Sequence, residues 1–480
     1  MDKKYITTIG LEIHAELKTN TKMFCACKND TEEKKPNVNI CPVCTGHPGT
    51  LPVINKEAVR KVLLVGKALG GTLADFTEFD RKNYFYPDIP KGYQISQYKY
   101  PLVSGGSLNG VAITRVHLEE DTAKSSHDTG DFSLVDFNRS GVPLMELVTE
   151  PVIHSAKEAS DFAKELQLLL QYLGAGDANL EKGEMRVEAN ISVSDTDKFG
   201  TKVEVKNLNS FKAVEKAIEY EVNRHISLLE KGEKVIQETR GWDENKEATF
   251  SQRLKENSHD YRYFPDPDLP KLKLSQIDEF SGESLKKELP ELPWQRRERY
   301  VTEYALKPEE AEIYVGSPVW KRFFEEVLKF VSEDKSLVKL SSNYITSDLI
   351  GLSKDLLKTE GDTFLSLTAK VSPKSFSQLI KMVAKKDISS RGAKDILAFM
   401  YASGGDPEVI AKEKDLIQKS DEGTIKILVE KVLASNEKAI AEYKAGKASA
   451  LQFLIGQGMK ESKGSANPEI LKKLFLEKLV

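Results

Sequence analysis

Two segments that lie far apart in the sequence alternate strictly between apolar and polar residues, and this pattern constrains the fold more than any other feature. Apolar residues occupy every second position from Ile9 to Leu17, and again from Met185 to Val193. A period of two is typical of a β-strand with one buried and one polar face. Shorter segments with strand character are Val111–Leu118, Met145–Thr149 and Thr201–Lys206.

Two amphipathic helices are expected between these strands. Ser155–Glu158 has the pattern of a capping box, and the apolar residues after it recur at helical spacing until Gly174. A second helix is expected over Phe211–Lys231. Because the strands come in pairs between helices, we predict an antiparallel α+β domain rather than a doubly wound parallel sheet.

The prolines of Leu289–Trp294 mark a change in the character of the chain. After them the pattern is helical, and Ser372-Pro373 and Asp406-Pro407 each place a capping side chain before a proline. A chain of 480 residues is expected to form two or three domains, since a single core stops growing near ~250–300 residues. We therefore predict an α+β domain over residues 1–294 and two helical domains, over 295–405 and 406–480.

Charge and hydropathy exclude several classes of protein. The 70 Lys and Arg against 74 Asp and Glu give a net charge of −4, which argues against non-specific coating of nucleic acid but allows a local basic surface. No apolar run approaches the ~20 residues that a membrane span needs, and Met1–Lys4 leads into a strand without an apolar signal segment. We expect a cytoplasmic protein with no membrane partner.

The four cysteines of the chain all fall within twenty residues, as Cys25-Ala-Cys27 and Cys41-Pro-Val-Cys44. A structural zinc ion takes four tetrahedral thiolate ligands, and two short cysteine loops can supply them. The spacing of the second pair is usual for zinc, whereas the single-residue gap of the first is not, and His47 is an alternative ligand. We predict a structural zinc site rather than four unrelated thiols. Four thiolates leave no open position for catalysis.

Acidic and histidine side chains gather on the polar faces of the expected strands. Glu12, His14 and Glu16 share one face of the first strand, and Arg115, His117 and Glu119 share a face of another, which runs on into Glu120. Glu188 and Glu204 belong to later strands. Oxygen ligands that converge from several strands are what a magnesium–nucleotide site requires. The alternative is the solvated face of a half-exposed sheet.

Two segments combine aromatic rings with cations and acids: Phe79–Asp88 and Asp260–Asp268. Such rings can stack on bases while the cations hold phosphates, although tyrosines can equally be core residues. The sequence has no GxxxxGK[ST] loop and no GxGxxG after a strand, which argues against P-loop and Rossmann nucleotide sites.

Five long motifs of the sequence are Ile9–Thr19, Phe79–Asp88, His117–Lys124, Lys206–Phe211 and Asp260–Pro270. They resemble the motifs of one family, the B subunits of tRNA-dependent amidotransferases (GatB of the heterotrimer GatCAB). The resemblance runs nearly end to end, and Ala448–Pro468 is similar to the YqeY-like tail of that family.

The resemblance implies a glutamine synthetase/guanido kinase-like catalytic domain, an all-α cradle and a YqeY-like tail that touches the tRNA. It also implies a ligase that uses ATP to phosphorylate the glutamate of Glu-tRNA(Gln) or the aspartate of Asp-tRNA(Asn). Ammonia, supplied by the glutaminase of the heterotrimer (GatA), then displaces the phosphate, and a small third protein (GatC) completes the assembly.

From this resemblance we assign roles to particular residues. We expect Mg²⁺ at Glu12, at His14 and at the Glu119–Glu120 pair, with Glu204 in support; the sequence leaves open which of Glu119 and Glu120 faces inward. Lys82, Tyr84, Arg186 and Lys206 would hold ATP or the terminal adenosine of the tRNA. Lys447, Lys460 and Lys463 would contact the tRNA body by shape rather than by sequence.

Two other functions remain open at this point. One is an ATP-dependent ligase that acts on a free amino acid, which would need no tRNA. The other is a tRNA-binding scaffold without catalysis, whose acidic face is merely solvated.

Overall fold

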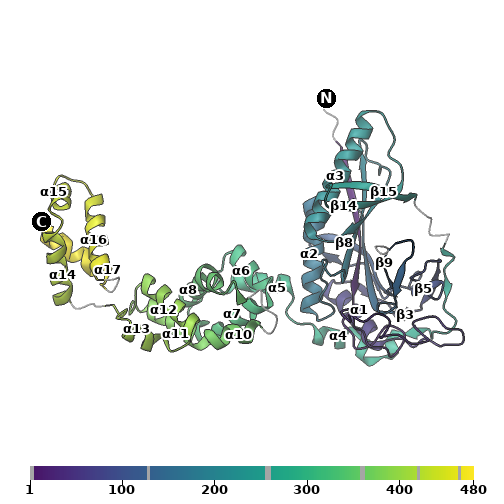
Figure 1. Ribbon diagram of the computed structural model, residues 1–480, viewed down its shortest axis with the longest axis horizontal. Helices are drawn as coiled ribbons and strands as arrows, with labels where there is room; N and C mark the ends of the chain where they lie inside the picture. The colour runs from purple at the N-terminus through teal and green to yellow at the C-terminus, as the bar shows by residue number, and fades with distance from the viewer. Residues whose placement is uncertain are drawn as a thin grey trace. The chain divides into compact units, whose positions relative to one another are not determined.

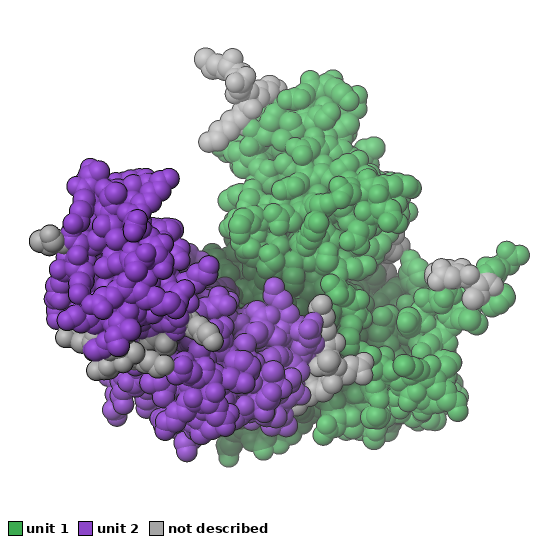
Figure 2. Space-filling view, turned by 60° about the vertical axis from the view of Figure 1, so that its left-hand side comes forward, with its two compact units in different colours: residues 1–293 green, residues 294–480 purple. Residues whose placement is uncertain are grey.

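The structure, a computed structural model, describes residues 5–126, 130–254, 261–356, 363–418, 422–462 and 466–479. The chain divides into two units, residues 1–293 and residues 294–480, which are coloured green and purple in Figure 2. The division falls within the proline-containing segment Leu289–Trp294.

A ten-stranded sheet dominates the first unit (Figure 1). Its strands are β1 (Ile6–Glu16), β2 (Thr72–Leu73), β6 (Val103–Ser104), β7 (Ser107–Leu108), β8 (Val111–Glu120), β11 (Pro143–Thr149), β12 (Met185–Ser194), β13 (Val203–Leu208), β14 (Glu238–Asp243) and β15 (Ala248–Leu254). The order across the sheet is β15-β14-β13-β12-β1-β11-β8-β6-β2, and β7 pairs with β8. Within the described residues, every neighbouring pair of this sheet is antiparallel except β13 and β14. The prediction of an antiparallel α+β fold is therefore confirmed.

The two alternating segments of the sequence lie side by side as β1 and β12. They pair antiparallel, with Ile9 opposite Ile191 and His14 opposite Arg186. The alternating apolar positions of β1 from Ile9 onward are almost completely buried; Ile13, for example, has none of its surface exposed. Successive side chains of a strand point to opposite faces, so the polar residues of β1 lie together on the other face of the sheet.

Helices α2 (Ala156–Tyr172) and α3 (Phe211–Glu230) pack against each other, and α3 packs against β12 (Figure 1). Both start at a serine whose side chain accepts a backbone hydrogen bond, Ser155 from the amide of Glu158 and Ser210 from that of Ala213. The carboxylate of Glu158 accepts from the amide of His154 rather than of Ser155, so the capping box is only half formed.

Shorter elements complete the first unit. Strands β4 (Asp80–Asn83), β5 (Tyr93–Ser96) and β16 (Phe264–Pro265) form a three-stranded sheet in the order β16-β4-β5. The other elements are the strand pairs β9 (Lys124–Ser126) with β10 (Leu134–Asp136) and β3 (Phe76–Thr77) with β17 (Leu272–Lys273), the helices α1 (Lys56–Ala68) and α4 (Gly282–Glu288), and two 3-10 turns, Leu274–Gln276 and Asp278–Phe280.

The described part of the second unit is helical, as predicted. Ser372 and Asp406 are confirmed as N-caps before a proline. None of the described helices has both the length and the apolar character that a membrane crossing requires. The helices are α5 (Pro293–Thr302), α6 (Pro308–Val315), α7 (Pro318–Val331), α8 (Lys335–Tyr344), a π-helical turn (Ile345–Leu349), α9 (Ile350–Leu352), α10 (Thr363–Lys370), α11 (Pro373–Ala384), α12 (Ser390–Ser403), α13 (Pro407–Glu413), α14 (Glu422–Ala434), α15 (Glu437–Lys444), α16 (Ser449–Glu461) and α17 (Pro468–Leu479).

Helices α14, α16 and α17 share an apolar core of their own. Val429, Leu454 and Phe475 have no exposed surface in it. Helix α13 instead packs against α11 and α12. Residues 407–413, which the sequence assigned to the tail, therefore lie against the helices that precede them.

Candidate active site

A polar pocket of about 260 Å³ opens among the strands of the first unit. Its walls come from β1, β8, β11, β13 and β14 of the large sheet and from β4 and β5 of the small one. The residues that line it are Glu12, Lys82, Ser96, Gln97, Tyr98, Arg115, His117, Glu146, Glu204, Lys206, Thr239, Tyr261 and Tyr263.

Three neighbouring strands bring a cluster of histidines and carboxylates to this pocket. His14 on β1 lies opposite Glu146 on β11, and Glu146 lies opposite His117 on β8. The Nε2 atom of His14 is 3.4 Å from Oε1 of Glu119 and 3.5 Å from Oε2 of Glu146. Nε2 of His117 is 3.3 Å from the same Glu146 oxygen. The ligand atoms of Glu12, His14 and Glu146 all lie within 4.8 Å of one another, a spacing that a single cation can bridge.

Glu146 is the central carboxylate of the site, and sequence reasoning missed it. The segment around it was predicted as a strand, but Glu146 was not singled out. It is the one charged residue of β11, whose remaining residues are Pro, Leu, Met, Val and Thr. A lone acid in a buried strand is costly unless it is paired, and that is the signal that could have found it.

Burial and the charges of this cluster shift the pKa values of its members in different directions. Burial alone would lower the pKa of His14, but hydrogen bonds to Glu119 and Glu146 raise it well above its ordinary value. Burial also raises the pKa of Glu12, and the nearby charges of Glu146 and Glu188 raise it further. Burial would likewise raise the pKa of Glu146, but His117 and His14 hold it well below the ordinary value. The carboxylates of the site therefore carry more negative charge than its two histidines balance.

A second group of polar residues comes from the neighbouring strands. Oε2 of Glu204 on β13 accepts a hydrogen bond of 2.6 Å from the hydroxyl of Thr239 on β14. Nζ of Lys206 lies 2.9 Å from Oε2 of Glu188 on β12. The ligand atoms of Glu12, Glu188 and Glu204 again fall within 4.8 Å of one another, so Glu12 joins the two groups.

Aromatic rings and a lysine form the rim of the pocket. Nζ of Lys82 lies 5.0 Å from the ring centre of Tyr261 and 5.7 Å from that of Tyr84. The rings of Tyr98 and Tyr263 are stacked with their centres 4.3 Å apart. Burial lowers the pKa of Lys82, but the charge of Glu119 and the neighbouring tyrosines outweigh it, and the net shift is upward. A cation is thus held beside the carboxylates.

The two aromatic motifs, far apart in sequence, meet at this rim. Nε of Arg81 pairs with Oδ2 of Asp266 at 2.7 Å, and Nη2 pairs with Oδ2 of Asp268 at 3.0 Å. The side-chain amide of Asn83 donates to the backbone oxygen of Tyr261 at 3.1 Å. These contacts fix the segment of Tyr261 and Tyr263 against β4. Asp260, the first residue of the second motif, lies outside the described residues.

Glu120 does not lie in the pocket, which corrects the sequence prediction. It follows Glu119 directly on β8, and neighbouring side chains of a strand point to opposite faces. Its carboxylate accepts a hydrogen bond of 2.9 Å from the amide of Ile95 and forms an ion pair with Lys91. Only Glu119 of the two is close to His14.

Two other predicted residues have partners that the sequence did not suggest. Arg186, expected to hold phosphate, forms an ion pair with Asp121 and does not line the pocket. The hydroxyl of Tyr84 donates to Oε1 of Gln94 at 3.3 Å, and its ring contacts that of Tyr261 edge-on.

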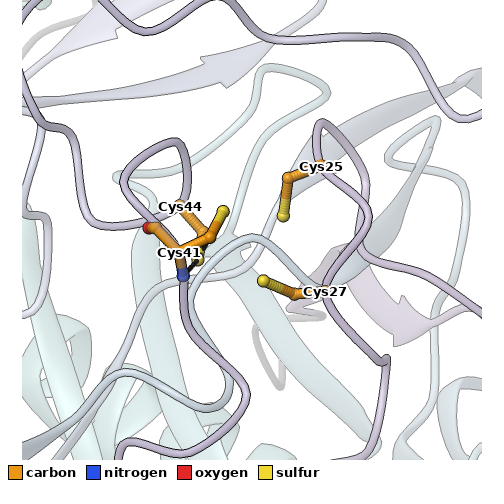
Figure 3. Close-up of side chains that lie close together, drawn as sticks. All are labelled: Cys25, Cys27, Cys41 and Cys44. Atoms are coloured by element: carbon orange, nitrogen blue, oxygen red, sulfur yellow. Dashed lines mark hydrogen bonds between the residues drawn. The ribbon is translucent and has the colours of Figure 1, made fainter.

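The four cysteines converge in a second cluster of the same unit (Figure 3). Their Sγ atoms all lie within 4.8 Å of one another, and those of Cys41 and Cys44 are 3.9 Å apart. A zinc ion bound to four thiolates at about 2.3 Å places neighbouring sulfur atoms roughly 3.8 Å apart. The amide of Cys41 also donates to Sγ of Cys44 at 3.2 Å. A hydrogen bond from Cys25 lowers the pKa of Cys44 to about 5, against the effect of burial. The residues fit a tetrahedral zinc site, and His47 is not part of the cluster.

Comparison with known proteins identifies the family. The sequence profile of the GatB/GatE catalytic domain matches residues 7–278, which include the whole pocket, and that of the GatB domain matches residues 322–479. The chain belongs to the GatB family. Relatives named as the B subunit of aspartyl/glutamyl-tRNA(Asn/Gln) amidotransferase include those of Carboxydothermus hydrogenoformans (43% identical, 99% of each chain), Caldicellulosiruptor saccharolyticus (44%, 99% of each) and Thermotoga petrophila (45%, 98% of each).

The part of the chain that matches the GatB domain contains the tail lysines singled out in the sequence. Nζ of Lys447 lies 2.9 Å from Oε2 of Glu442, and Lys460 is exposed. Lys463 lies outside the described residues. The GatB family match thus spans both the pocket and these lysines.

Proposed function

We propose that this chain is the GatB component of an aspartyl/glutamyl-tRNA amidotransferase, a ligase that converts Glu-tRNA(Gln), Asp-tRNA(Asn) or both to the amides with ATP and ammonia. The family match over the whole chain supports this assignment. The observation that carries it to particular residues is a cluster of Glu12, His14, Glu119 and Glu146, of which Glu12 and Glu146 line the pocket together with Lys82.

The donor set suits Mg²⁺, which prefers carboxylate oxygens and shares them with phosphates. Glu12, Glu119 and Glu146, with His14, would hold the ion, and Glu204 would support it. Burial raises the pKa of Glu12, and repulsion from Glu146 and Glu188 adds to the shift. When bound, the ion neutralises charge on the phosphates of ATP.

The residues of the chain then have separate tasks in the reaction. Lys82 and Lys206 orient the phosphates of ATP and the carboxylate of the esterified amino acid. An oxygen of that carboxylate forms a bond to the γ-phosphorus as the bond to ADP breaks. Phosphate is a better leaving group than oxide, so ammonia can form the C–N bond while phosphate departs. The catalytic gain comes mainly from positioning and charge neutralisation.

The proposal also assigns the zinc ion, the domains, the tail lysines and the partner proteins. The cysteine cluster holds a structural zinc ion, since four thiolates close its coordination shell. Residues 1–294 form a glutamine synthetase/guanido kinase-like domain with this zinc insertion, and residues 295–405 form the cradle. Residues 406–480 form a YqeY-like tail, whose first helix, α13, packs against the cradle helices α11 and α12. Lys447, Lys460 and Lys463 of the tail contact the tRNA body. The glutaminase GatA and the small protein GatC are the partners.

Glu12→Gln tests the function directly. We expect it to abolish amide formation on mischarged tRNA, because it removes a charge from the ligand set, while tRNA affinity stays unchanged. Glu150→Gln, at an exposed position just after β11, is the matched control and should keep full activity.

Three results would contradict the proposal. Equal loss of tRNA affinity in Glu12→Gln would assign that residue to binding. Amidation of free glutamate without tRNA would favour a ligase for free amino acids. No ATP cleavage with Glu-tRNA and Mg²⁺ would favour a scaffold.

A further inference from the structure

Lys22 is buried completely beside the cysteine cluster. None of its surface is exposed, and it is among the largest fully buried side chains of the described residues. Its Nζ lies 3.9 Å from Sγ of Cys44 and donates to the backbone oxygen of Phe137 at 3.2 Å. Within the described residues, Lys22 forms no ion pair; the Glu120 carboxylate, which also lies beside Gly141, pairs with Lys91.

A buried ammonium group without an anion nearby is unfavourable. Removing such a charge from water is costly, and one backbone oxygen satisfies only one of its three N–H donors. Neutral thiols are weak acceptors and carry no compensating charge. Thiolates bound to zinc supply the negative charge that stabilises Lys22 as a buried ammonium group.

We propose that Lys22 is the buried counter-ion of a zinc–tetrathiolate cluster formed by Cys25, Cys27, Cys41 and Cys44. Four thiolates around one divalent cation carry a net negative charge, and Lys22 brings a positive charge to the thiolate that lies deepest in the protein. The proposal rests on the zinc site proposed above. Lys22 acts on the metal through Cys44, so it is a positioning residue and not a ligand.

The local backbone holds Lys22 and Cys44 together. The amide of Lys22 donates to the backbone oxygen of Cys27 at 3.0 Å, which ties it to the first cysteine pair. The hydroxyl of Ser140 donates to the backbone oxygen of Cys44 at 3.0 Å. One loop, residues 137–141, therefore contacts both Lys22, through the oxygen of Phe137, and Cys44.

Gly141 in that loop has a reason to be glycine. Its φ of +84° is one that glycine adopts readily, and a Cβ there would lie 3.4 Å from Cβ of Cys44 and 3.7 Å from Cδ of Lys22. The loop leads directly into β11, the strand of Glu146. The lysine and the cysteines thereby stiffen the chain just before the central carboxylate of the pocket.

Zinc affinity of the full-length chain tests this role without any measurement of activity. The dissociation constant is obtained by competition with a chromophoric chelator at fixed pH. We expect Lys22→Met, which keeps the length of the side chain but removes its charge, to weaken zinc binding roughly 10- to 100-fold, the usual effect of losing a group that supports a metal ligand. Lys22→Gln, which keeps a donor, should weaken it similarly.

Lys28→Met is the control, because Lys28 lies next to Cys27 but is exposed and pairs with Asp30. Its zinc affinity should equal that of the wild type. If either Lys22 variant does not fold, the other carries the comparison, and both are titrated in the presence of excess zinc before the chelator is added.

The outcomes separate the two proposals. Unchanged zinc affinity in Lys22→Met or Lys22→Gln would overturn the counter-ion role and leave the zinc site intact. A wild-type chain that takes up no zinc would overturn both. Neither result bears on the amidotransferase function, which is judged by amide formation on the same preparation.

Discussion

The first unit holds two clusters of ligand residues that differ in almost every physical respect. The cysteine cluster takes its four sulfur atoms from two short loops, so its ligands are close in sequence. The carboxylate–histidine cluster takes its oxygen and nitrogen atoms from five strands, β1, β8, β11, β12 and β13. Its ligand residues are spread over the sequence from Glu12 to Glu204. It opens into a pocket of about 260 Å³.

This difference separates a structural metal site from a catalytic one. Soft thiolates that surround a zinc ion completely leave no position for a substrate. Hard carboxylates at the wall of a pocket leave positions for phosphate and water. Damage to the first cluster should therefore reduce stability, and damage to the second should reduce the rate of the reaction.

Glu146→Gln disrupts the carboxylate–histidine cluster and should have the largest effect of the four substitutions. Glu146 contacts both His14 and His117, and its loss removes the charge that joins three strands. We expect kcat for amide formation to fall roughly 100- to 1,000-fold, as for removal of a group that stabilises developing charge. Initial rates with saturating mischarged tRNA measure this. Normal activity would remove Glu146 from the catalytic machinery.

Glu221→Gln tests a buried ionic network that belongs to neither cluster. Burial raises the pKa of Glu221, but its close contact with His225 and its hydrogen bonds from Arg224 and Thr249 lower it to about 2. Because the folded pKa lies below the ordinary value, the carboxylate stabilises the fold above about pH 4.5, and this contribution disappears as the pH falls toward 2.

We expect the variant to lose about 3 kcal/mol of unfolding free energy at pH 7, with the difference from wild type shrinking below about pH 4.5. Urea unfolding at several pH values measures it. A difference that grows on acidification would contradict the assignment. Lys216, in an exposed pair with Glu247, provides the control variant Lys216→Ala.

Cys41→Ser disrupts the cysteine cluster by removing one of its four thiolate ligands. We expect loss of bound zinc and proteolytic cleavage within residues 20–50, whereas kcat changes less than about tenfold, because no cysteine lines the pocket. Metal analysis and limited proteolysis measure the first two effects. A loss of activity as large as that of Glu146→Gln, with the fold intact, would erase the contrast between the clusters.

Arg81→Ala weakens the rim of the pocket and should have the smallest effect of the four substitutions. Arg81 joins β4, which carries Lys82, to the segment of Asp266. We expect KM for ATP to rise roughly tenfold with a smaller change in kcat, since binding geometry rather than charge at the reacting atoms is lost. Arg81→Lys should recover part of the loss. The control is Lys271→Ala, because Lys271 is an exposed lysine that forms an ion pair with Glu78.

For the first unit, the sequence predicted which segments form strands and helices better than it predicted the face of the sheet to which each side chain points. Strict alternation identified β1 and β12, because each has one apolar face in the core and one polar face. It could not decide between Glu119 and Glu120, since adjacent residues of a strand differ only in which face the register assigns to the core.

Long-range pairing explains what sequence reasoning missed. Glu146 belongs to the site because β11 lies between β1 and β8, and no local pattern states that order. Arg81 and Asp266 meet through the pairing of β4 and β16 in the same way. The cysteine cluster needed no such information, because loop spacing alone brings the sulfur atoms together.

The most direct test of the catalytic assignment is the release of ADP by the chain with its partner proteins and Mg²⁺, compared between mischarged and uncharged tRNA. We expect ADP only with the mischarged tRNA, and hydroxylamine in place of ammonia should trap the activated carboxyl group as a hydroxamate. Release of ADP at the same rate with uncharged tRNA, or no hydroxamate on the charged one, would contradict activation of the aminoacyl carboxylate in this pocket.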